Sequence, residues 1–491
     1  MTATLTSRPM AATTTASTSS ADSAGARANL VLLLVGLGAL AVSLSQSILV
    51  PVLSILPAKL GTSATNISWL LTSTLLVAAV SVPIMGRLGD MFGKRRMLLV
   101  AIGALSVGSL VTALTSDIVV LIAGRAIQGV SAAAIPLGIS LLSTAMPREK
   151  VGSSIALVSA MLGIGGALGL PLAGFVAEHA DYHLLFWINA AMGAVAFLGI
   201  LLAVPEPAAR SGGRLDWTGS VLLAAGLVGL LLPLSQGGDW GWTDPKTITL
   251  LSAAAVILTV FGATQTRIRQ PLVDLKALRS RPIMLVNVAS ICFGFALFAS
   301  FIGSASYVES PTASGYGFGS SLLIGGLVLL PSGIAMLLLA PVAAKLIARR
   351  GAPHTLALGA MVIAAGWLGR IVFTDQLWQV FLYTTIVGIG TGIGYAAIPS
   401  IINAHTPSSE LASANGLNTL FRSLGSSLAS AIGSSILAGS SILVGGFSLP
   451  SLSAYRELFA LCAAAALLTA LCVLFIPHTA VAKTAGAPTG E

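Results

Sequence analysis

The sequence predicts an all-α polytopic membrane protein with fourteen transmembrane helices. Hydrophobic residues make up 55% of the 491 residues, charged residues make up 8%, and the mean hydropathy is +0.95, far above that of soluble domains. Apolar runs of roughly 20 residues recur along the chain, and this length crosses a hydrocarbon core of about 30 Å. A β-barrel is excluded, because its strands would alternate apolar and polar residues with a period of two.

Charged or turn-forming residues separate the apolar runs. Gly-, Pro- and Ser-containing segments such as 54–66 and 205–215 interrupt them, and charged clusters follow the second and the fourth run. These residue types favour turns over continued helix. The predicted helices cover residues 30–53, 67–86, 97–115, 118–142, 151–177, 184–204, 216–236, 247–266, 283–308, 321–344, 355–373, 377–400, 414–440 and 456–476.

Lysine and arginine predict how these helices are oriented. An even number of spans places both termini on one side of the membrane. If that side is the cytoplasm, 19 of the 25 Lys and Arg residues face it, three lie outside and three lie within spans. Short cytoplasmic loops carry such an excess, so we expect a multi-pass protein of the plasma membrane with both termini cytoplasmic. The net charge of +9 follows from this topology and requires no nucleic-acid partner.

Two motifs recur in the same order along the chain. GRLGDMFGKRR (86–96) is echoed by PVAAKLIARRG (341–351), and SAAAIP (131–136) is echoed by GYAAIP (394–399). Membrane transporters are often built from internal repeats. The predicted division of the chain is a disordered cytoplasmic tail at 1–29, a six-helix half at 30–204, a linker with two extra helices at 205–282, a second six-helix half at 283–476 and a cytoplasmic tail at 477–491.

Nothing in the sequence points to an enzyme, a cofactor or a metal centre. The three cysteines lie within apolar runs, as small core residues do, and no Cys/His spacing typical of a metal site occurs. A phosphate-binding loop ending in Gly-Lys-Ser/Thr is also missing from the sequence. We therefore expect neither catalysis nor a cofactor, and a chain that functions as a monomer in the lipid bilayer.

The charged cluster and two helical motifs resemble the major facilitator superfamily, specifically its fourteen-helix drug:proton antiporters. The loop motif between helices 2 and 3 of that superfamily resembles a set of residues here, namely Gly86, Leu88, Asp90, Gly93, Lys94, Arg95 and Arg96. Its helix 4 motif is similar to Leu121, Arg125, Gln128 and Gly129. The helix 5 motif of the exporting branch is similar to Gly165, Gly169, Pro171 and Gly174. The resemblance implies alternating access and proton-driven export.

Arg125 is the first candidate for proton coupling or gating, together with Gln128. An arginine within a span costs a few kcal/mol unless it faces the bundle interior or a water-filled cavity. The alternative is that Arg125 ties helices together through backbone carbonyls. Asp90 is the second candidate, because the echo of its cluster has Lys345 at the matching place. We expect Asp90 to form a breakable polar contact with the start of a neighbouring helix.

The other charges near the spans are weaker candidates. Arg370 and Arg422 are expected near span ends, where a long side chain reaches the interface. No acid is predicted near the middle of a span, so the proton-carrying residue stays unassigned; the acids nearest to spans, which also fit solvated loops, are Asp117, Glu309 and Asp375.

Small and polar residues supply candidates for a gate and a cavity. Gly165, Gly169, Pro171 and Gly174 would form either a flexible gate or a tight helix contact, because small residues allow backbones to approach. Polar residues within spans would line a substrate cavity or bond neighbouring helices, and the candidates are Gln46, Asn189, Tyr395 and Asn418.

The sequence thus predicts a secondary transporter that exports a lipophilic small molecule, such as a drug or antibiotic, by proton antiport. The apolar set of candidate lining residues favours recognition by shape, and neutral or anionic compounds have the same weight as cations. Two alternatives stay open. One is a transporter of a metabolite (an amino acid, sugar or siderophore) on the same fold, and the other is a membrane scaffold or receptor without transport.

Overall fold

The computed structural model describes residues 15–207 and 210–476. The first helix already begins at Thr15. The rest of the predicted N-terminal tail and the whole tail at 477–491 lie outside the described residues, so both tails stay predictions.

Long helices, short helical turns and one small hairpin make up the described chain. Their bounds are α1 Thr15–Ser47, η1 Pro51–Ser54, α2 Leu56–Leu60, α3 Ala64–Phe92, α4 Lys94–Ala113, α5 Ile118–Gly129, η2 Val130–Ala133, α6 Ala134–Ala145, α7 Arg148–His179, α8 His183–Ala203, α9 Trp217–Trp240, α10 Pro245–Gln265, α11 Leu275–Leu278, α12 Arg281–Glu309, η3 Thr312–Ser314, α13 Leu322–Leu327, α14 Leu330–Arg350, α15 Ala352–Val372, α16 Leu377–Ala404, α17 Leu411–Gly439, β1 Ser441–Val444, β2 Phe447–Pro450 and α18 Leu452–Leu474.

Twelve helical segments in the described part of the chain are long and apolar enough to cross a membrane. This confirms a multi-pass, all-helical membrane protein. Within α12, only Arg281–Leu297 forms a shorter apolar segment. The 29-residue α17 is not among the twelve, and its sequence is rich in Ser, Gly and Asn. The predicted total of fourteen spans is therefore not established by length and hydropathy alone.

Two of the spans are interrupted where a proline removes a backbone donor. Helix α5 continues through the 3-10 turn η2 into α6, whose third residue is Pro136. Helices α13 and α14 are separated at Val328 and Leu329, directly before Pro331. Proline has no N–H for the helical ladder and its ring crowds the preceding turn, so both breaks follow from the sequence.

The turns that end α3 and α14 each depend on one glycine with a positive φ. Gly93 has φ +123° and joins α3 to α4, while Gly351 has φ +82° and joins α14 to α15. This conformation strongly favours glycine. The two turns therefore match at a separation of 258 residues, three more than the separation that pairs GRLGDMFGKRR with PVAAKLIARRG in sequence.

A β-hairpin after α17 is absent from the sequence-based prediction. Strands β1 and β2 pair antiparallel, with Val444 opposite Phe447. The two residues between them, Gly445 and Gly446, have φ of +59° and +85°, the sign that a tight hairpin turn requires at both positions. The Gly-Gly pair between two apolar stretches is the signal that would have predicted this hairpin.

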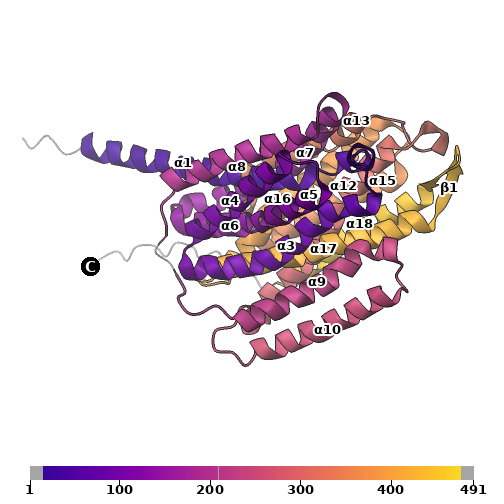
Figure 1. Ribbon diagram of the computed structural model, residues 1–491. Coiled ribbons are helices and arrows are strands. Elements are labelled where there is room, and N and C mark those ends of the chain that lie inside the picture. Colours follow the sequence, from indigo (N-terminus) through magenta and orange to yellow (C-terminus); the bar gives the residue numbers. More distant parts are fainter. Residues whose placement is uncertain (1–14, 208–209, 477–491) are drawn as a thin grey trace, which may run out of the picture.

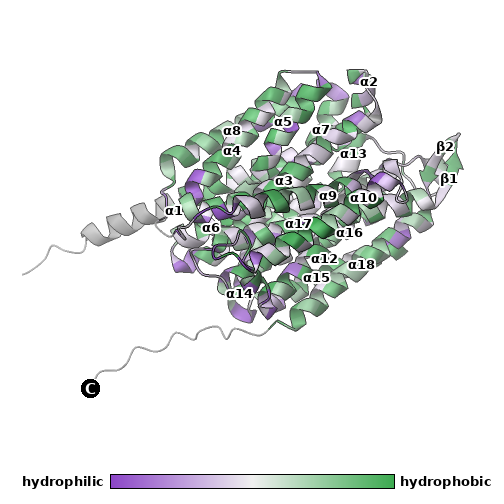
Figure 2. Ribbon diagram, turned by 60° about the horizontal axis from the view of Figure 1, so that its bottom comes forward, coloured by the Kyte–Doolittle hydropathy of each residue, from purple (hydrophilic) through white to green (hydrophobic). Residues whose placement is uncertain are grey.

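The helices form one elongated bundle, and the hairpin and the start of α1 project from its opposite ends (Figure 1). Helices α9 and α10 pack against each other at its side, and α9 contacts α3 and α17 (Figure 1). The largest core cluster draws its buried residues only from 286–476, and a second draws all but Ala412 from 31–204. Hydrophilic residues gather at the helix ends, many of them at the end from which α1 projects (Figure 2).

Candidate functional site

The α3–α4 turn lies against the start of α17. We call this end of the bundle the basic end, because the helix ends at the turn carry Arg87, Lys94, Arg95 and Arg96. Asp90 is fully buried. Its carboxylate accepts hydrogen bonds from the backbone N–H of Ala412 at 3.1 Å and of Ser413 at 2.8 Å, and from Ser413 Oγ at 2.7 Å. The first N–H groups of a helix have no partner within the helix and carry a partial positive charge. The residue before α17, Glu410, makes no side-chain cap, so Asp90 of α3 caps α17 instead.

Lys94 makes a second contact between the same two regions. Its side chain is only 1% exposed, and its Nζ donates to the backbone oxygen of Ser408 at 2.8 Å. A hydrogen bond from a charged donor is stronger than a neutral one. The α3–α4 turn is therefore attached to the α16–α17 turn by two buried charged side chains of opposite sign.

Glu206 caps α4 and is the residue that sequence reasoning missed. Its carboxylate accepts from the backbone N–H of Arg95 at 3.1 Å and of Arg96 at 3.0 Å. A Cβ placed on Gly93 would lie 2.7 Å from that carboxylate, so a side chain there would displace Glu206, and the positive φ of Gly93 favours glycine as well. The sequence did carry a signal for this role: Glu206 lies between Pro205 and Pro207, directly after the span predicted at 184–204.

Backbone contact and two amides close the basic end further. A Cβ on Gly86 would lie 2.7 Å from the backbone oxygen of Ala412, so α3 and α17 meet with no room for a side chain. On the next helices, Asn403 donates to Ser143 Oγ at 2.8 Å and accepts from Asn415 at 2.8 Å. Residues far apart in sequence thus hold α3, α6, α16 and α17 together at this end.

Arg125 lies at the centre of a buried polar cluster and is 1% exposed. Its Nε donates to the backbone oxygen of Leu70 at 3.2 Å, and its Nη1 donates to the backbone oxygen of Ser45 at 3.1 Å and to Gln128 Oε1 at 2.6 Å. Gln128 in turn donates to Ser109 Oγ at 3.0 Å. The guanidinium therefore joins α1, α3 and α5, and the carbonyl contacts agree with the structural alternative as well as with a coupling role.

The predicted acids lie away from Arg125. Asp117 is exposed and caps α5 by accepting from the N–H groups of Val119 and Val120 at 2.8 and 3.0 Å. Asp375 is exposed and Glu309 is half-buried at the end of α12. Among the described side chains, none of these carboxylates is hydrogen-bonded to Arg125, so the proton-carrying group stays unassigned.

The small residues of α7 serve two contacts rather than one. Gly165 faces α1, where a Cβ would lie 2.8 Å from the backbone oxygen of Leu40, and Gly169 faces the same helix. Gly174 faces α13, where a Cβ would lie 2.8 Å from the backbone oxygen of Leu322, and Pro171 lies against Gly326. The first pair holds helices of the same sequence half together, whereas the second pair lies between the halves.

Replacing Gly174 with alanine is expected to push α7 and α13 apart. The added Cβ would meet backbone atoms of Leu322 and Leu323 at 2.8 to 2.9 Å, and overpacking of this kind costs about 1–3 kcal/mol. We expect a lower melting temperature of the purified protein in detergent and reduced transport. The matched control is Gly262→Ala in α10, where a Cβ meets nothing within 4 Å. Equal melting temperatures for both variants would contradict the close approach.

The structure does not bring all four predicted cavity residues together. Asn189 is buried beside the Arg125 cluster, where it donates to Ser109 Oγ at 3.0 Å, and Gln46 is exposed on α1. Asn418 is buried on α17 and donates to Asn287 Oδ1 and Ser290 Oγ of α12, both at 2.8 Å. Tyr395 lies on α16, and its ring centre is 5.1 Å from Cζ of Arg422. Arg422 follows Asn418 on α17 by four residues.

The expectation that Arg370 and Arg422 reach an interface from span ends is wrong. Arg370 is fully buried, with its Cζ 4.6 Å from the ring centre of Phe459 and 5.4 Å from that of Tyr307. Aromatic faces attract cations, which explains why this side chain turns inward. Helix α17 begins at Leu411, so Arg422 lies about 16 Å along its axis and not near its end.

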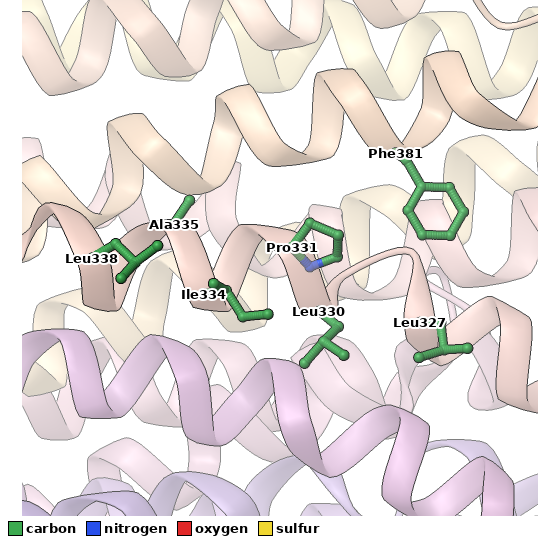
Figure 3. A pocket seen from close by; sticks show the side chains of 7 residues that line it. All are labelled: Leu327, Leu330, Pro331, Ile334, Ala335, Leu338 and Phe381. Atoms are coloured by element: carbon green, nitrogen blue, oxygen red, sulfur yellow. The ribbon is translucent and has the colours of Figure 1, made fainter.

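A groove on the outside of the bundle has only apolar walls (Figure 3). Its volume is about 400 Å³, and it lies on α13, α14 and α16. Leu338 and Ile334 on its rim are 70% and 43% exposed. Exposed leucine and isoleucine on a membrane-spanning helix suit contact with lipid chains, so this groove is not part of the polar site.

A multi-pass helical bundle with internal sequence repeats is typical of membrane transport proteins. The chain belongs to the Major Facilitator Superfamily, whose sequence profile matches residues 35–430 and 332–491. This membership confirms the resemblance seen in the sequence and the prediction of a transport protein rather than an enzyme.

Curated relatives and a solved structure agree with this assignment. The tetracenomycin C resistance and export protein of Streptomyces glaucescens is 27% identical over 82% of this chain and 74% of its own length. The multidrug resistance protein Stp of Mycobacterium tuberculosis is 26% identical over 83% and 76%, and the puromycin resistance protein pur8 of Streptomyces alboniger is 28% identical over 72% and 69%. The human organic anion transporter MFSD10 has the same fold, with a TM-score of 0.64 at 14% identity over 91% of this chain and 99% of that chain.

Proposed function

We propose that the protein is a secondary transporter that exports lipophilic drugs or antibiotics across the plasma membrane by proton antiport. The observation that carries this proposal is the contact of Asp90 with the start of α17, a polar contact between two distant parts of a superfamily member. The relatives include a tetracenomycin C resistance and export protein, a multidrug resistance protein and a puromycin resistance protein, which favours export over uptake of a metabolite.

Alternating access explains why such a contact would be useful. A contact made of a few hydrogen bonds to a helix start can break and reform at modest cost, whereas a large apolar interface cannot. In the state described here, the basic end is closed by Asp90, Lys94 and the Asn403–Ser143 bond. Breaking these contacts would open that end to substrate from the cytoplasm, and reforming them would commit the substrate to the other side.

The proposed topology has fourteen crossings, with α12 and α17 as the two spans beyond the twelve most apolar ones. These two helices pack against each other within the bundle, and each has 29 residues, enough to cross about 30 Å at 1.5 Å per residue. The excess of Lys and Arg at the basic end favours a cytoplasmic location for that end and for both termini. The core clusters agree with two halves joined by α9 and α10.

Export driven by the pH gradient is the expected result in inside-out membrane vesicles. Vesicles from cells that lack their major drug exporters and express this chain should take up fluorescent drugs when energised, and vesicles without it should not. Nigericin, which collapses the pH gradient, should stop uptake, whereas valinomycin, which collapses the electrical potential, should leave much of it. Uptake that survives nigericin would contradict proton antiport. No uptake of any dye or antibiotic in a panel of cations, neutral compounds and anions would contradict export and favour a metabolite transporter or a non-transporting scaffold.

A further inference from the structure

In the proposed topology, Arg422 lies near the middle of a membrane-spanning helix, α17, without a carboxylate partner. It lies eleven residues after the first residue of α17, Leu411, which is about 16 Å along the axis and near half the thickness of a hydrocarbon core of about 30 Å. The fifteen acids among the described residues lie in loops or toward helix ends. Among the described side chains, the guanidinium of Arg422 has one partner, the ring of Tyr395, whose centre is 5.1 Å from Cζ.

The surroundings of Arg422 belong to the interior of the bundle. Gly294 of α12 faces it, since a Cβ there would lie 3.0 Å from Arg422 Cγ, and Tyr395 belongs to α16. Asn418, one turn earlier on the same face of α17, bonds to α12, and Ser426, one turn later, donates to the backbone oxygen of Gly294 at 3.4 Å. The arginine is therefore part of a polar row between three helices and does not point toward lipid.

Arg370 shows how this protein encloses a guanidinium completely. Arg370 is 0% exposed and lies between Tyr307 and Phe459, and it donates to Ser304 Oγ at 3.2 Å. Arg422 is instead partly exposed and has an aromatic ring on only one of its faces. An arginine in a span is costly without a partner. The guanidinium face that no aromatic ring covers is therefore suited to reversible binding of an anion.

We propose that Arg422 binds the acidic group of an amphipathic organic anion, with the aromatic part of the ligand against Tyr395. The guanidinium offers a planar fork that fits a carboxylate with two hydrogen bonds. Tyr395 packs edge to face with Phe293 at 5.3 Å between ring centres and is 7% exposed, so its ring is held in place beside the guanidinium. This inference rests on the proposed export function and names its substrate class: an organic acid with an aromatic body, preferred over its neutral and cationic analogues.

Binding to the purified protein in detergent tests the inference separately from transport. The probes are 1-naphthylacetate, its neutral amide 1-naphthylacetamide and the cation 1-naphthylmethylammonium, measured by calorimetry or by quenching of protein fluorescence. Wild-type protein should bind the anion about tenfold or more tightly than the amide, since hydrogen bonds between two charged groups are stronger than those to a neutral acceptor. Arg422→Gln should remove this preference, and Arg422→Lys should keep the order anion, amide, cation. The control Arg456→Gln changes an exposed arginine on α18 and should alter nothing.

The outcomes separate the inference from the function on which it rests. Equal binding of the three probes to wild-type protein, or an unchanged preference in Arg422→Gln, would overturn the anion site even if vesicles export cationic dyes. A preference for the anion that Arg422→Gln abolishes supports the site, and vesicles that then export nothing would overturn only the export function. If Arg422→Gln does not elute as a single peak on size exclusion, the wild-type order and Arg422→Lys decide the result.

Discussion

Replacing Arg125 with alanine is expected to abolish export. The guanidinium donates to two backbone oxygens, of Leu70 and Ser45, and to the side chain of Gln128, all within a region closed to solvent. A buried polar group that loses its partner costs about 1–3 kcal/mol, so α1, α3 and α5 should lose their common connection. The measurement is drug uptake into inside-out vesicles at matched expression, together with the melting temperature of the purified variant.

Lysine at the same position distinguishes a coupling role from a structural one. Arg125→Lys keeps the positive charge but offers a compact ammonium in place of the planar fork, so it cannot reach Leu70, Ser45 and Gln128 with the same geometry. If Arg125 takes part in coupling, this variant should fold with nearly wild-type stability and still lose most proton-driven uptake. If Arg125→Lys loses uptake only in proportion to its loss of folded protein, Arg125 serves to connect helices and has no coupling role. Normal uptake in Arg125→Ala would contradict both roles.

The membrane class of the fold could be predicted from composition, because the energetic rule is simple. Apolar runs of sufficient length have few other stable locations than a bilayer, and the prolines that follow the α5–α6 and α13–α14 breaks are visible in the sequence. Helices α12 and α17, the two further spans of the proposed topology, are less apolar, and polar residues of one bond to polar residues of the other. Asn418 and Asn287 satisfy one another, and that pairing cannot be read from either helix alone.

Contacts between distant residues explain why the site was only partly predictable. The sequence marks Asp90 as unusual and suggests the start of some neighbouring helix, but only the fold shows that this helix is α17. Glu206 looks like a loop acid until α4 is seen to begin beside it. Arg370 looks like an interfacial arginine because its aromatic partners, Tyr307 and Phe459, come from α12 and α18.

Replacing Asp90 with asparagine is expected to weaken the closed basic end and to slow export severely. Asparagine keeps one oxygen acceptor but has no negative charge. Its NH₂ group would face the N–H and O–H donors of Ala412 and Ser413, from which it cannot accept hydrogen bonds. A lost charge or cap at a helix N-terminus costs about 0.5–2 kcal/mol, and about 1.4 kcal/mol changes a population tenfold. Spin labels at Phe92 and Ala404, both exposed at the basic end, should report longer distances in Asp90→Asn than in the parent protein.

A matched variant separates this latch from ordinary helix capping. Asp216 caps its own helix, α9, by accepting from Gly219 N–H at 2.8 Å, and it also accepts from Gln265 of the neighbouring α10. Asp216→Asn therefore removes a similar carboxylate without touching the contact between α3 and α17. It should lower stability by a comparable amount, leave the Phe92–Ala404 distance unchanged and preserve most of the export. If Asp90→Asn behaves in the same way, with normal transport and an unchanged distance, the contact at Asp90 stabilises the turn and has no part in alternating access.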